Sequence, residues 1–293
     1  MTAPATALGR ARSWLYVPAH RTDLVGKALT GAADAVVLDL EDAVPPQAKD
    51  TARAAAVTVL EAPRTVPVWV RMNTLDSPWA RADTDALASA RPDGVRVPKA
   101  ADVAAVAELA ERLALPVHLL LESALGVESA FLLARCHPLV AGVSLGEADL
   151  AADLHVRDPA ALRWARQRVV VANRAAGLPS PVAAVWTDLA DLDGLAADSI
   201  AARDEGFFGR SVIHPTQLEP VHRAFTPAAA EIDSARALLD SLHTAAEHGE
   251  SAFVDERGRF VDPAVVAGAR WLLDLAPGLD DPAATTAAGR EHP

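Results

Sequence analysis

The sequence lacks several residue types that particular kinds of site require. It has one cysteine, Cys136, and one thiol alone forms neither an internal disulfide nor a zinc site. Only three of its 27 basic residues are lysines, which leaves few side chains for a Schiff-base mechanism. No run of about 18 apolar residues occurs, and the N-terminus does not have the pattern of a signal peptide. These absences predict a soluble, cytoplasmic protein without disulfides.

The charge balance argues against polyanionic partners. The formal net charge is −12 and no basic patch stands out, so neither nucleic acid nor an anionic membrane is expected to bind. The composition is 51% hydrophobic and 23% charged, which is enough apolar material for a sizeable core. A chain of 293 residues can form one large α/β barrel or two ordinary domains.

One stretch, residues 34–53, suggests where a site would form. It begins with an apolar run, 35–38, typical of a strand that is buried on both faces. Three carboxylates follow within four residues, and two prolines then precede a helical pattern. A buried strand therefore delivers acids to its C-terminal end, where ligands gather in parallel α/β folds. Alternatively, the acids cap the next helix and pair with Lys49 or Arg53.

The pattern of a strand followed by a helix occurs eight times and predicts a (β/α)8 TIM barrel, an α/β fold, with a C-terminal helical and hairpin extension. The predicted strands are 13–19, 35–38, 66–73, 94–99, 116–123, 140–149, 181–186 and 206–215. The helices between them are predicted at about 20–29, 46–62, 79–90, 101–114, 126–135, 158–177 and 190–205. We expect a flexible N-terminus over 1–12 and the barrel over 13–226.

The extension, 227–276, has a different pattern. A long helix is predicted over 227–248, followed by a short hairpin over 251–262 that turns at Glu256 to Gly258. Asp262 and Pro263 then open another helix, as N-cap and first helical residue. The tail, 277–293, is expected to be disordered.

Polar residues stand at the ends of successive predicted strands. They are Asp39, Glu41, Asp42, Arg71, Asn73, Lys99, Glu122, Glu147 and Asp149. So many carboxylates at one mouth would repel one another, so either some are protonated or a cation lies among them. Without a His or Cys cluster, oxygen ligands favour Mg²⁺ or Mn²⁺. Arg71 would then bind a substrate anion or a developing enolate.

The chain resembles the HpcH/HpaI aldolase and citrate lyase superfamily, specifically the citrate lyase β-subunit-like CoA ester lyases. The resemblance runs through nearly the whole predicted barrel. The stretches that carry it are RSWLYVPAHR (12–21), AVVLDLEDAV (35–44), VWVRMN (68–73), VPKA (97–100), LLLESALGV (119–127), SLGEADLAADL (144–154) and GFFGRSVIHPTQL (206–218).

The resemblance implies roles for individual residues. Glu122 and Asp149 would hold Mg²⁺, and Arg71 would contact the substrate carboxylate or enolate. The acids that would orient Arg71 and metal-bound water are Asp39, Glu41 and Asp42. Candidate partners for the CoA phosphates are Arg21 and Lys27. The family usually reads G-A-E-D-L where this chain has GEADL, so Asp149 keeps its register while any role of the neighbouring acid, here Glu147, is in doubt.

The resemblance also bears on chemistry and assembly. In the malyl-CoA and citramalyl-CoA lyase branch, an aspartate of the C-terminal segment closes over a neighbouring subunit's barrel as acid/base. Asp262 matches it, although its position also suits a plain N-cap. The implied reaction is a Mg²⁺-dependent retro-aldol cleavage, or the reverse condensation, of a 3-hydroxyacyl-CoA such as malyl-CoA or citramalyl-CoA. Its partners would be acyl-CoA and a small 2-oxo or hydroxy acid, and the assembly a homotrimer or a hexamer.

Three other functions stay open. A class II pyruvate aldolase without CoA would need a base, for which His20 and His118 are the candidates, although His118 lies mid-strand and is better explained as core. A Schiff-base aldolase would use Lys99. A non-catalytic subunit of a citrate lyase-type complex would bind without turnover. His214 is interpreted as structural, fixing the turn after the last strand.

Overall fold

The computed structural model describes residues 8–247, 252–255, 258 and 260–275. It divides into two compact units, one ending at Phe225 and one beginning at Thr226. No helix within these ranges is long and apolar enough to cross a bilayer. The expectation of a flexible segment over 1–12 is wrong for residues 8–12, because Leu8 and Ala11 are buried and Arg12 pairs with Asp34 at 2.8 Å. The remainder of that segment lies outside the described residues.

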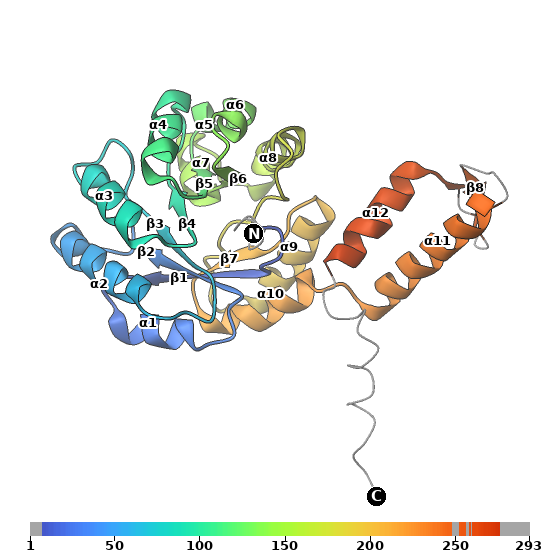
Figure 1. Cartoon of the computed structure of the whole chain (residues 1–293), viewed down its shortest axis with the longest axis horizontal. Coiled ribbons are helices and arrows are strands. Elements are labelled where there is room, and N and C mark those ends of the chain that lie inside the picture. The colour runs from blue at the N-terminus through green and yellow to red at the C-terminus, as the bar shows by residue number, and fades with distance from the viewer. Residues whose placement is uncertain (1–7, 248–251, 256–257, 259, 276–293) are drawn as a thin grey trace, which may run out of the picture. The chain divides into compact units, whose positions relative to one another are not determined.

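The first unit contains a seven-stranded parallel sheet in the order β6-β5-β4-β3-β2-β1-β7. Its strands are β1 (Ser13–Pro18), β2 (Ala35–Asp39), β3 (Val68–Arg71), β4 (Gly94–Val97), β5 (Val117–Leu121), β6 (Val140–Leu145) and β7 (Arg210–Val212). The sheet is curled, with helices around its outside (Figure 1). The α/β architecture predicted from the sequence is therefore confirmed.

The seventh predicted strand, 181–186, does not form as a regular strand. Ala183 makes a single parallel bridge to Arg210 of β7. On the other side, the Val182 N–H donates to Ser144 Oγ of β6 at 2.9 Å rather than to a backbone carbonyl. Pro181 has no N–H to donate at all. A side-chain hydrogen bond thus stands where a regular backbone ladder to β6 was expected.

The helices largely follow the predicted pattern. The α-helices of the first unit are α1 (Thr22–Leu29), α2 (Lys49–Glu61), α3 (Ala80–Ala90), α4 (Val103–Leu113), α5 (Ala124–Glu128), α6 (Ala130–Arg135), α7 (Glu147–Asp153), α8 (Arg163–Ala175), α9 (Leu192–Asp204) and α10 (Leu218–Phe225). Short 3₁₀ turns are η2 (Pro46–Ala48), η3 (Pro159–Leu162) and η4 (Pro215–Gln217). The helices α7 and α10 were not predicted from the sequence. The sixth strand was predicted to reach Asp149, whereas β6 ends at Leu145.

Aromatic side chains fill the space inside the curled sheet near the N-terminal ends of its strands, away from the predicted site. Trp14 and Trp69 meet edge to face with ring centroids 5.5 Å apart, and Trp69 meets His118 at 6.5 Å. Gly94 makes room for this packing, because a Cβ there would lie 2.4 Å from the Trp69 ring. This packing fixes the neighbouring strands, and with them the directions of the side chains at their other ends.

The second unit is a helical hairpin. Its elements are α11 (Ala229–Glu247), β8 (Phe253–Val254), β9 (Phe260–Val261) and α12 (Pro263–Asp274), and the two short strands pair antiparallel. Leu238, Val261 and Val266 form a small core between them. Asp262 caps α12, as its sequence position predicts, by accepting N–H groups from Ala264 and Val265 at 3.0 Å each. Residues 256–257 of the predicted turn and the predicted disordered tail lie outside the described residues.

Candidate active site

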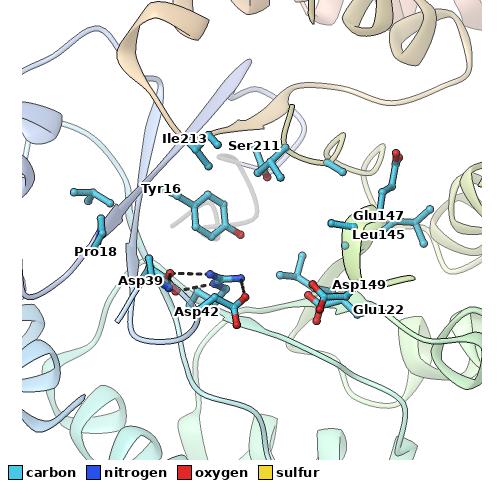
Figure 2. Close-up of a pocket in the computed structure, with 18 residues that line it drawn as sticks. Tyr16, Pro18, Asp39, Asp42, Glu122, Leu145, Glu147, Asp149, Ser211 and Ile213 are labelled. Carbon is cyan, nitrogen blue, oxygen red and sulfur yellow. Dashed lines mark hydrogen bonds and ion pairs between the residues drawn. The ribbon is translucent and has the colours of Figure 1, made fainter. Parts of the chain in front are cut away.

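A cavity of about 510 Å³ lies at the C-terminal ends of the strands in the first unit. Its charged lining residues come from four different strand ends and are Asp39, Asp42, Arg71, Glu122, Glu147 and Asp149. Figure 2 shows Glu122 and Asp149 together, across the cavity from Asp39 and Asp42. The fold therefore brings most of the predicted site residues to one place.

Arg71 organises one side of this cavity. Its Nε and Nη2 donate to the two oxygens of Asp39, each at 2.7 Å. Its Nη1 lies 2.9 Å from Glu41 Oε2 and 3.1 Å from Asp42 Oδ2. Burial opposes the charge, but Asp39 and Glu41 raise the pKa of Arg71 well above its usual value. The guanidinium is therefore a fixed cation held by three acidic side chains, and its fork of N–H groups suits oxygen anions.

The backbone supports this arrangement. Asp39 also accepts N–H groups from Glu41 at 3.0 Å and Ala43 at 3.1 Å, so its carboxylate cannot turn away. Burial, partly offset by Arg71, raises the pKa of Glu41 to about 8. The alternative interpretation, in which these acids pair with Lys49, is not what the structure shows. The Lys49 ammonium instead donates to the carbonyls of Leu40 and Glu41 at 2.7 Å each, which fixes the turn that carries the acids.

Glu122 and Asp149 form the other side. Glu122 follows β5 and is 6% exposed, whereas Asp149 lies exposed in the first turn of α7. Burial, and then the nearby charge of Asp149, raise the pKa of Glu122 to about 7. Gly146 gives Glu122 its place, because a Cβ there would lie 2.5 Å from Glu122 Cγ. Two facing carboxylates that repel one another fit a hard divalent cation.

The donor set is small, and this decides which ion fits. Within the described ranges, no group of three or more His, Cys, Asp or Glu side chains has metal-binding geometry. An ion held by Glu122 and Asp149 would take its other ligands from water and substrate. That arrangement is typical of Mg²⁺, which keeps several waters and needs only one or two carboxylates.

Of the other three strand-end residues, Glu147 and Asn73 have structural partners. Glu147 points away from Glu122 and Asp149 (Figure 2) and lies 3.4 Å from Arg166. Asn73 donates from both its backbone N–H and its amide to Asp83 Oδ2, at 2.9 and 2.7 Å. Lys99 is exposed and adopts a left-handed φ of 50°, and its charge offsets part of the rise in the pKa of Glu122.

His118 and His214 have the structural roles that the sequence analysis predicts for them. His118 is 1% exposed and shares a 3.0 Å hydrogen bond with Ser144, and burial, together with Arg96, lowers its pKa well below the usual value. His214 accepts the Thr216 N–H at 3.3 Å and so fixes the start of η4. His20 is half-buried beside the start of α1 and does not line the cavity.

The remaining predicted residues lie apart from the cavity lining. Arg21 and Lys27 are exposed at α1, and Arg21 pairs with Asp23 at 3.0 Å. Asp262 belongs to the second unit, where it caps α12.

Tyr16 and Ser211 line the cavity, and Arg96 donates a hydrogen bond to each hydroxyl. None of the three was predicted from the sequence to belong to the site. The available signal was Arg96 itself, a charge in the middle of the apolar run of β4, where burial of an unpaired charge is costly.

Comparisons with known proteins agree with this geometry. A sequence model of the HpcH/HpaI aldolase/citrate lyase family matches residues 12–215. A (3S)-malyl-CoA thioesterase of Cereibacter sphaeroides is 37% identical over 276 residues, which cover 90% of this chain and 94% of that protein. A citrate lyase subunit beta-like protein of Deinococcus radiodurans is 38% identical over 287 residues, 93% of this chain and 99% of its own length.

Solved structures give the same answer. Protein CitE of Mycobacterium tuberculosis, in complex with magnesium, acetoacetate and coenzyme A, superposes with a TM-score of 0.78 at 32% identity, covering 92% of this chain and 98% of that one. The citrate lyase beta subunit of the same organism, with oxaloacetate and magnesium, gives a TM-score of 0.67 at 33% identity, covering 76% and 99%. On the family match and these relatives, the chain belongs to the HpcH/HpaI aldolase/citrate lyase family and is an enzyme of its citrate lyase β-like branch.

Proposed function

We propose that this protein is a Mg²⁺-dependent carbon–carbon lyase. It would cleave a 3-hydroxyacyl-CoA thioester, such as malyl-CoA or citramalyl-CoA, into a 2-oxo acid and an acyl-CoA, or condense the two. The observation that carries the proposal is the pairing of Glu122 and Asp149 opposite the clamped Arg71 in one cavity. One side offers oxygen ligands to a cation and the other offers a fixed cation to an anion.

Glu122 and Asp149 are the residues that would hold Mg²⁺. When bound, the ion would supply Lewis acidity to the hydroxyl and carboxylate oxygens of the substrate. Gly146 leaves the space that the Glu122 side chain occupies, and the first turn of α7 positions Asp149. Both carboxylates must be ionised to bind the metal, so the raised pKa of Glu122 links metal binding to pH.

Arg71 would stabilise the negative charge that develops on the thioester enolate. Its hydrogen bonds to Asp39 and Asp42 use three of its N–H groups, and Nη1 also lies 2.9 Å from Glu41 Oε2. A guanidinium has five N–H donors, so part of the fork stays available to the substrate. Because Asp39 holds the group at two points, little reorganisation is needed when charge develops.

Asp262 is the proposed acid/base, acting from a neighbouring subunit. Its N-cap hydrogen bonds both fall on Oδ1, so among the described residues Oδ2 accepts none and is left to face the substrate. In cleavage, the substrate hydroxyl gives its proton to solvent, from which Asp262 later regains the proton it donates, and the bond between the hydroxyl carbon and the α-carbon breaks. The electron pair moves to the α-carbon of the thioester, and Asp262 protonates that carbon. The net result moves one proton from oxygen to carbon.

We also propose how CoA binds, how the barrel closes and how the subunits assemble. Arg21 and Lys27, exposed at α1, would contact the CoA phosphates. Segment 181–186, beside β7, would take the place of the eighth strand and so close the barrel. A homotrimer, or a hexamer, would bring the second unit of one chain over the cavity of another.

The test is an assay of malyl-CoA and citramalyl-CoA that separates two sets of products. A lyase releases a 2-oxo acid, detected with phenylhydrazine, and leaves the CoA thiol esterified. A thioesterase releases the free thiol, and the similarity to (3S)-malyl-CoA thioesterases makes hydrolysis the second candidate. We expect the 2-oxo acid in the presence of Mg²⁺ and none after treatment with EDTA. Full activity after exhaustive chelation, or cleavage of free hydroxy-keto acids only, would overturn the proposal.

The role of Asp262 has its own test. Asp262→Asn keeps an N-capping side chain, so α12 should remain folded. We expect turnover to fall by about a hundredfold or more, because general acid–base groups contribute about 10²–10⁴. Mg²⁺ affinity should not change. Unchanged turnover would leave Asp262 with the role of a helix cap alone.

A further inference from the structure

The helix α7, which carries Asp149, is short and has few features that hold it in place. It has seven residues, Glu147–Asp153, and among the described residues no side chain caps its N-terminus. All seven residues are described, and Leu150 alone is buried. Because a helix this short is only marginally stable by itself in water, its position depends on the contacts that it makes with neighbouring segments.

Asp153, the last residue of α7, makes one of these contacts. Its Oδ2 accepts the backbone N–H of Ala124 at 2.7 Å. Ala124 is the first residue of α5 and follows Glu122 by two positions. A carboxylate that accepts an N–H at the start of a helix makes a charge-assisted hydrogen bond, which is stronger than a neutral one. Asp153 therefore links the helix that carries Asp149 to the segment that carries Glu122.

A backbone hydrogen bond links the same two segments at their other ends. The Gly146 N–H donates to the Leu121 carbonyl at 3.1 Å. This hydrogen bond and the side-chain hydrogen bond between α5 and α7 close a ring that consists of residues 121–124 and 146–153. The two carboxylates that would hold Mg²⁺ both belong to this ring, and they lie together in the cavity (Figure 2). Because the ring is closed at both ends, the two carboxylates have little freedom to move relative to one another.

We propose that Asp153 is a positioning residue, which sets the spacing between Glu122 and Asp149 by closing this ring. The inference rests on the proposed function, in which these two carboxylates hold Mg²⁺. Within the described ranges no group of three acids has metal-binding geometry, so Asp153 acts through the ring and not as a third ligand.

The ions Mg²⁺ and Ca²⁺ respond differently to the spacing of their ligands. Mg²⁺ needs near-octahedral geometry at about 2.0–2.1 Å, whereas Ca²⁺ accepts flexible geometry at about 2.3–2.6 Å. A ring that fixes the two carboxylates therefore matters more for the smaller ion. Opening the ring should reduce the affinity for Mg²⁺ much more than the affinity for Ca²⁺, and a general loss of stability would not produce this difference.

The variants Asp153→Ala and Asp153→Asn test this role by calorimetry with Mg²⁺ and with Ca²⁺ on the full-length protein, without substrate. Asp153→Ala removes the acceptor, so Mg²⁺ affinity should fall about tenfold and Ca²⁺ affinity less than about threefold. Asp153→Asn keeps an oxygen that can accept the Ala124 N–H but loses the charge, and it should keep the wild-type ratio of Mg²⁺ to Ca²⁺ affinity. The control is Asp158→Ala. Asp158 is also exposed but accepts the N–H of Ala160, at 2.9 Å, within its own turn η3, so neither affinity should change.

Hydrogen exchange in the wild-type protein covers the case in which Asp153→Ala does not fold. Coupling between two equilibria is reciprocal, so a hydrogen bond that strengthens Mg²⁺ binding is itself stabilised by Mg²⁺. Saturating Mg²⁺ should therefore slow exchange of the Ala124 amide hydrogen by about tenfold, the same factor as in the variant. The Ala160 amide, which donates to Asp158 in the same way, should exchange at an unchanged rate.

The outcomes separate the two proposals. Mg²⁺ binding to the wild-type protein is measured first, and its absence would overturn the proposed function and this inference with it. If the wild type binds Mg²⁺, an unchanged ratio of Mg²⁺ to Ca²⁺ affinity in Asp153→Ala would overturn the role of Asp153 alone. A ratio that falls as far in Asp153→Asn would also overturn it, since the charge and not the hydrogen bond would then matter. Equal effects of Mg²⁺ on exchange of the Ala124 and Ala160 amides would contradict it as well.

Discussion

The two sides of the cavity differ in how their charge is balanced. On one side, Asp39, Glu41 and Asp42 surround Arg71, whose guanidinium is held at two points by Asp39 at 2.7 Å. On the other side, Glu122 and Asp149 face one another, and the charge of Asp149 helps to raise the pKa of Glu122 to about 7. The first side holds a buried arginine among its acids, whereas among the described residues no basic side chain forms an ion pair with Glu122 or Asp149.

This difference indicates which side is built for binding a cation. A buried ion pair with good geometry is rigid and keeps its charge across the physiological pH range. Two carboxylates without an ion-paired basic side chain repel one another until a cation joins them, and relief of this repulsion favours binding of the cation. The comparison predicts that substitutions on the Arg71 side act mainly on folding and turnover. Substitutions on the Glu122 side should act mainly on metal affinity.

The largest effect is expected at Arg71. Arg71→Met would leave Asp39 and Glu41 buried without their cation, and breaking a buried pair costs about 3–5 kcal/mol of unfolding free energy. Arg71→Lys keeps the charge but loses the two-point contact, so its turnover should fall by about 10²–10³. Urea denaturation and steady-state kinetics measure these two effects.

A surface pair provides the control for Arg71. Arg223 lies 2.8 Å from Glu219, and both side chains are 72% exposed. Arg223→Met should change the unfolding free energy by less than about 1 kcal/mol. If Arg71→Met were equally mild, Arg71 would not be the buried counter-ion that its geometry indicates.

The next effect is the pH dependence that Glu122 gives to the metal-free protein. Because its pKa is raised to about 7 in the folded state, the folded protein holds this proton more tightly than the unfolded chain. The resulting stability is complete below the unfolded pKa and is lost as pH rises through about 7, by up to about 3 kcal/mol. Glu122→Gln should abolish this part of the slope. Denaturation from pH 4.5 to 8 in EDTA measures it, and identical slopes in the two proteins would contradict the assignment.

The smallest effect is expected at Gly146. Gly146→Ala would place a Cβ 2.5 Å from Glu122 Cγ and push that side chain out of position. We expect Mg²⁺ affinity to fall about tenfold, comparable to the loss of a residue that orients a metal ligand. Gly26→Ala on α1 is the control, because nothing lies within 4 Å of its added Cβ. Equal Mg²⁺ affinity in both variants would mean that Glu122 does not need the space at Gly146.

The sequence predicted the strands well where burial alone decides them. The strands β2 and β5 are mostly apolar and fully buried, as expected for a parallel sheet that is covered on both faces. It failed at residues 181–186, where a proline and the Ser144 hydroxyl replace a regular backbone ladder. It also failed at α7, since nothing in an apolar run followed by acids marks where β6 ends and a helix begins.

For the candidate site, the strand-end rule found the charged groups, and the family resemblance paired Asp39 with Arg71. Neither showed that Asn73 binds Asp83, because that contact joins distant segments. Tyr16 and Ser211 were missed because a hydroxyl in a strand has no distinctive pattern. Only the folded structure shows that Arg96 donates a hydrogen bond to each of them.

The central claim is that Glu122 and Asp149 together hold one hard divalent cation. Its most direct test is a Mn²⁺ titration followed by electron paramagnetic resonance, with Mg²⁺ as competitor, on the wild-type protein, Glu122→Gln and Asp149→Asn. The account predicts one site per chain in the wild type, displaced by Mg²⁺, and a loss of affinity of at least about a hundredfold in each variant. Binding of the same stoichiometry and affinity in both variants would contradict it.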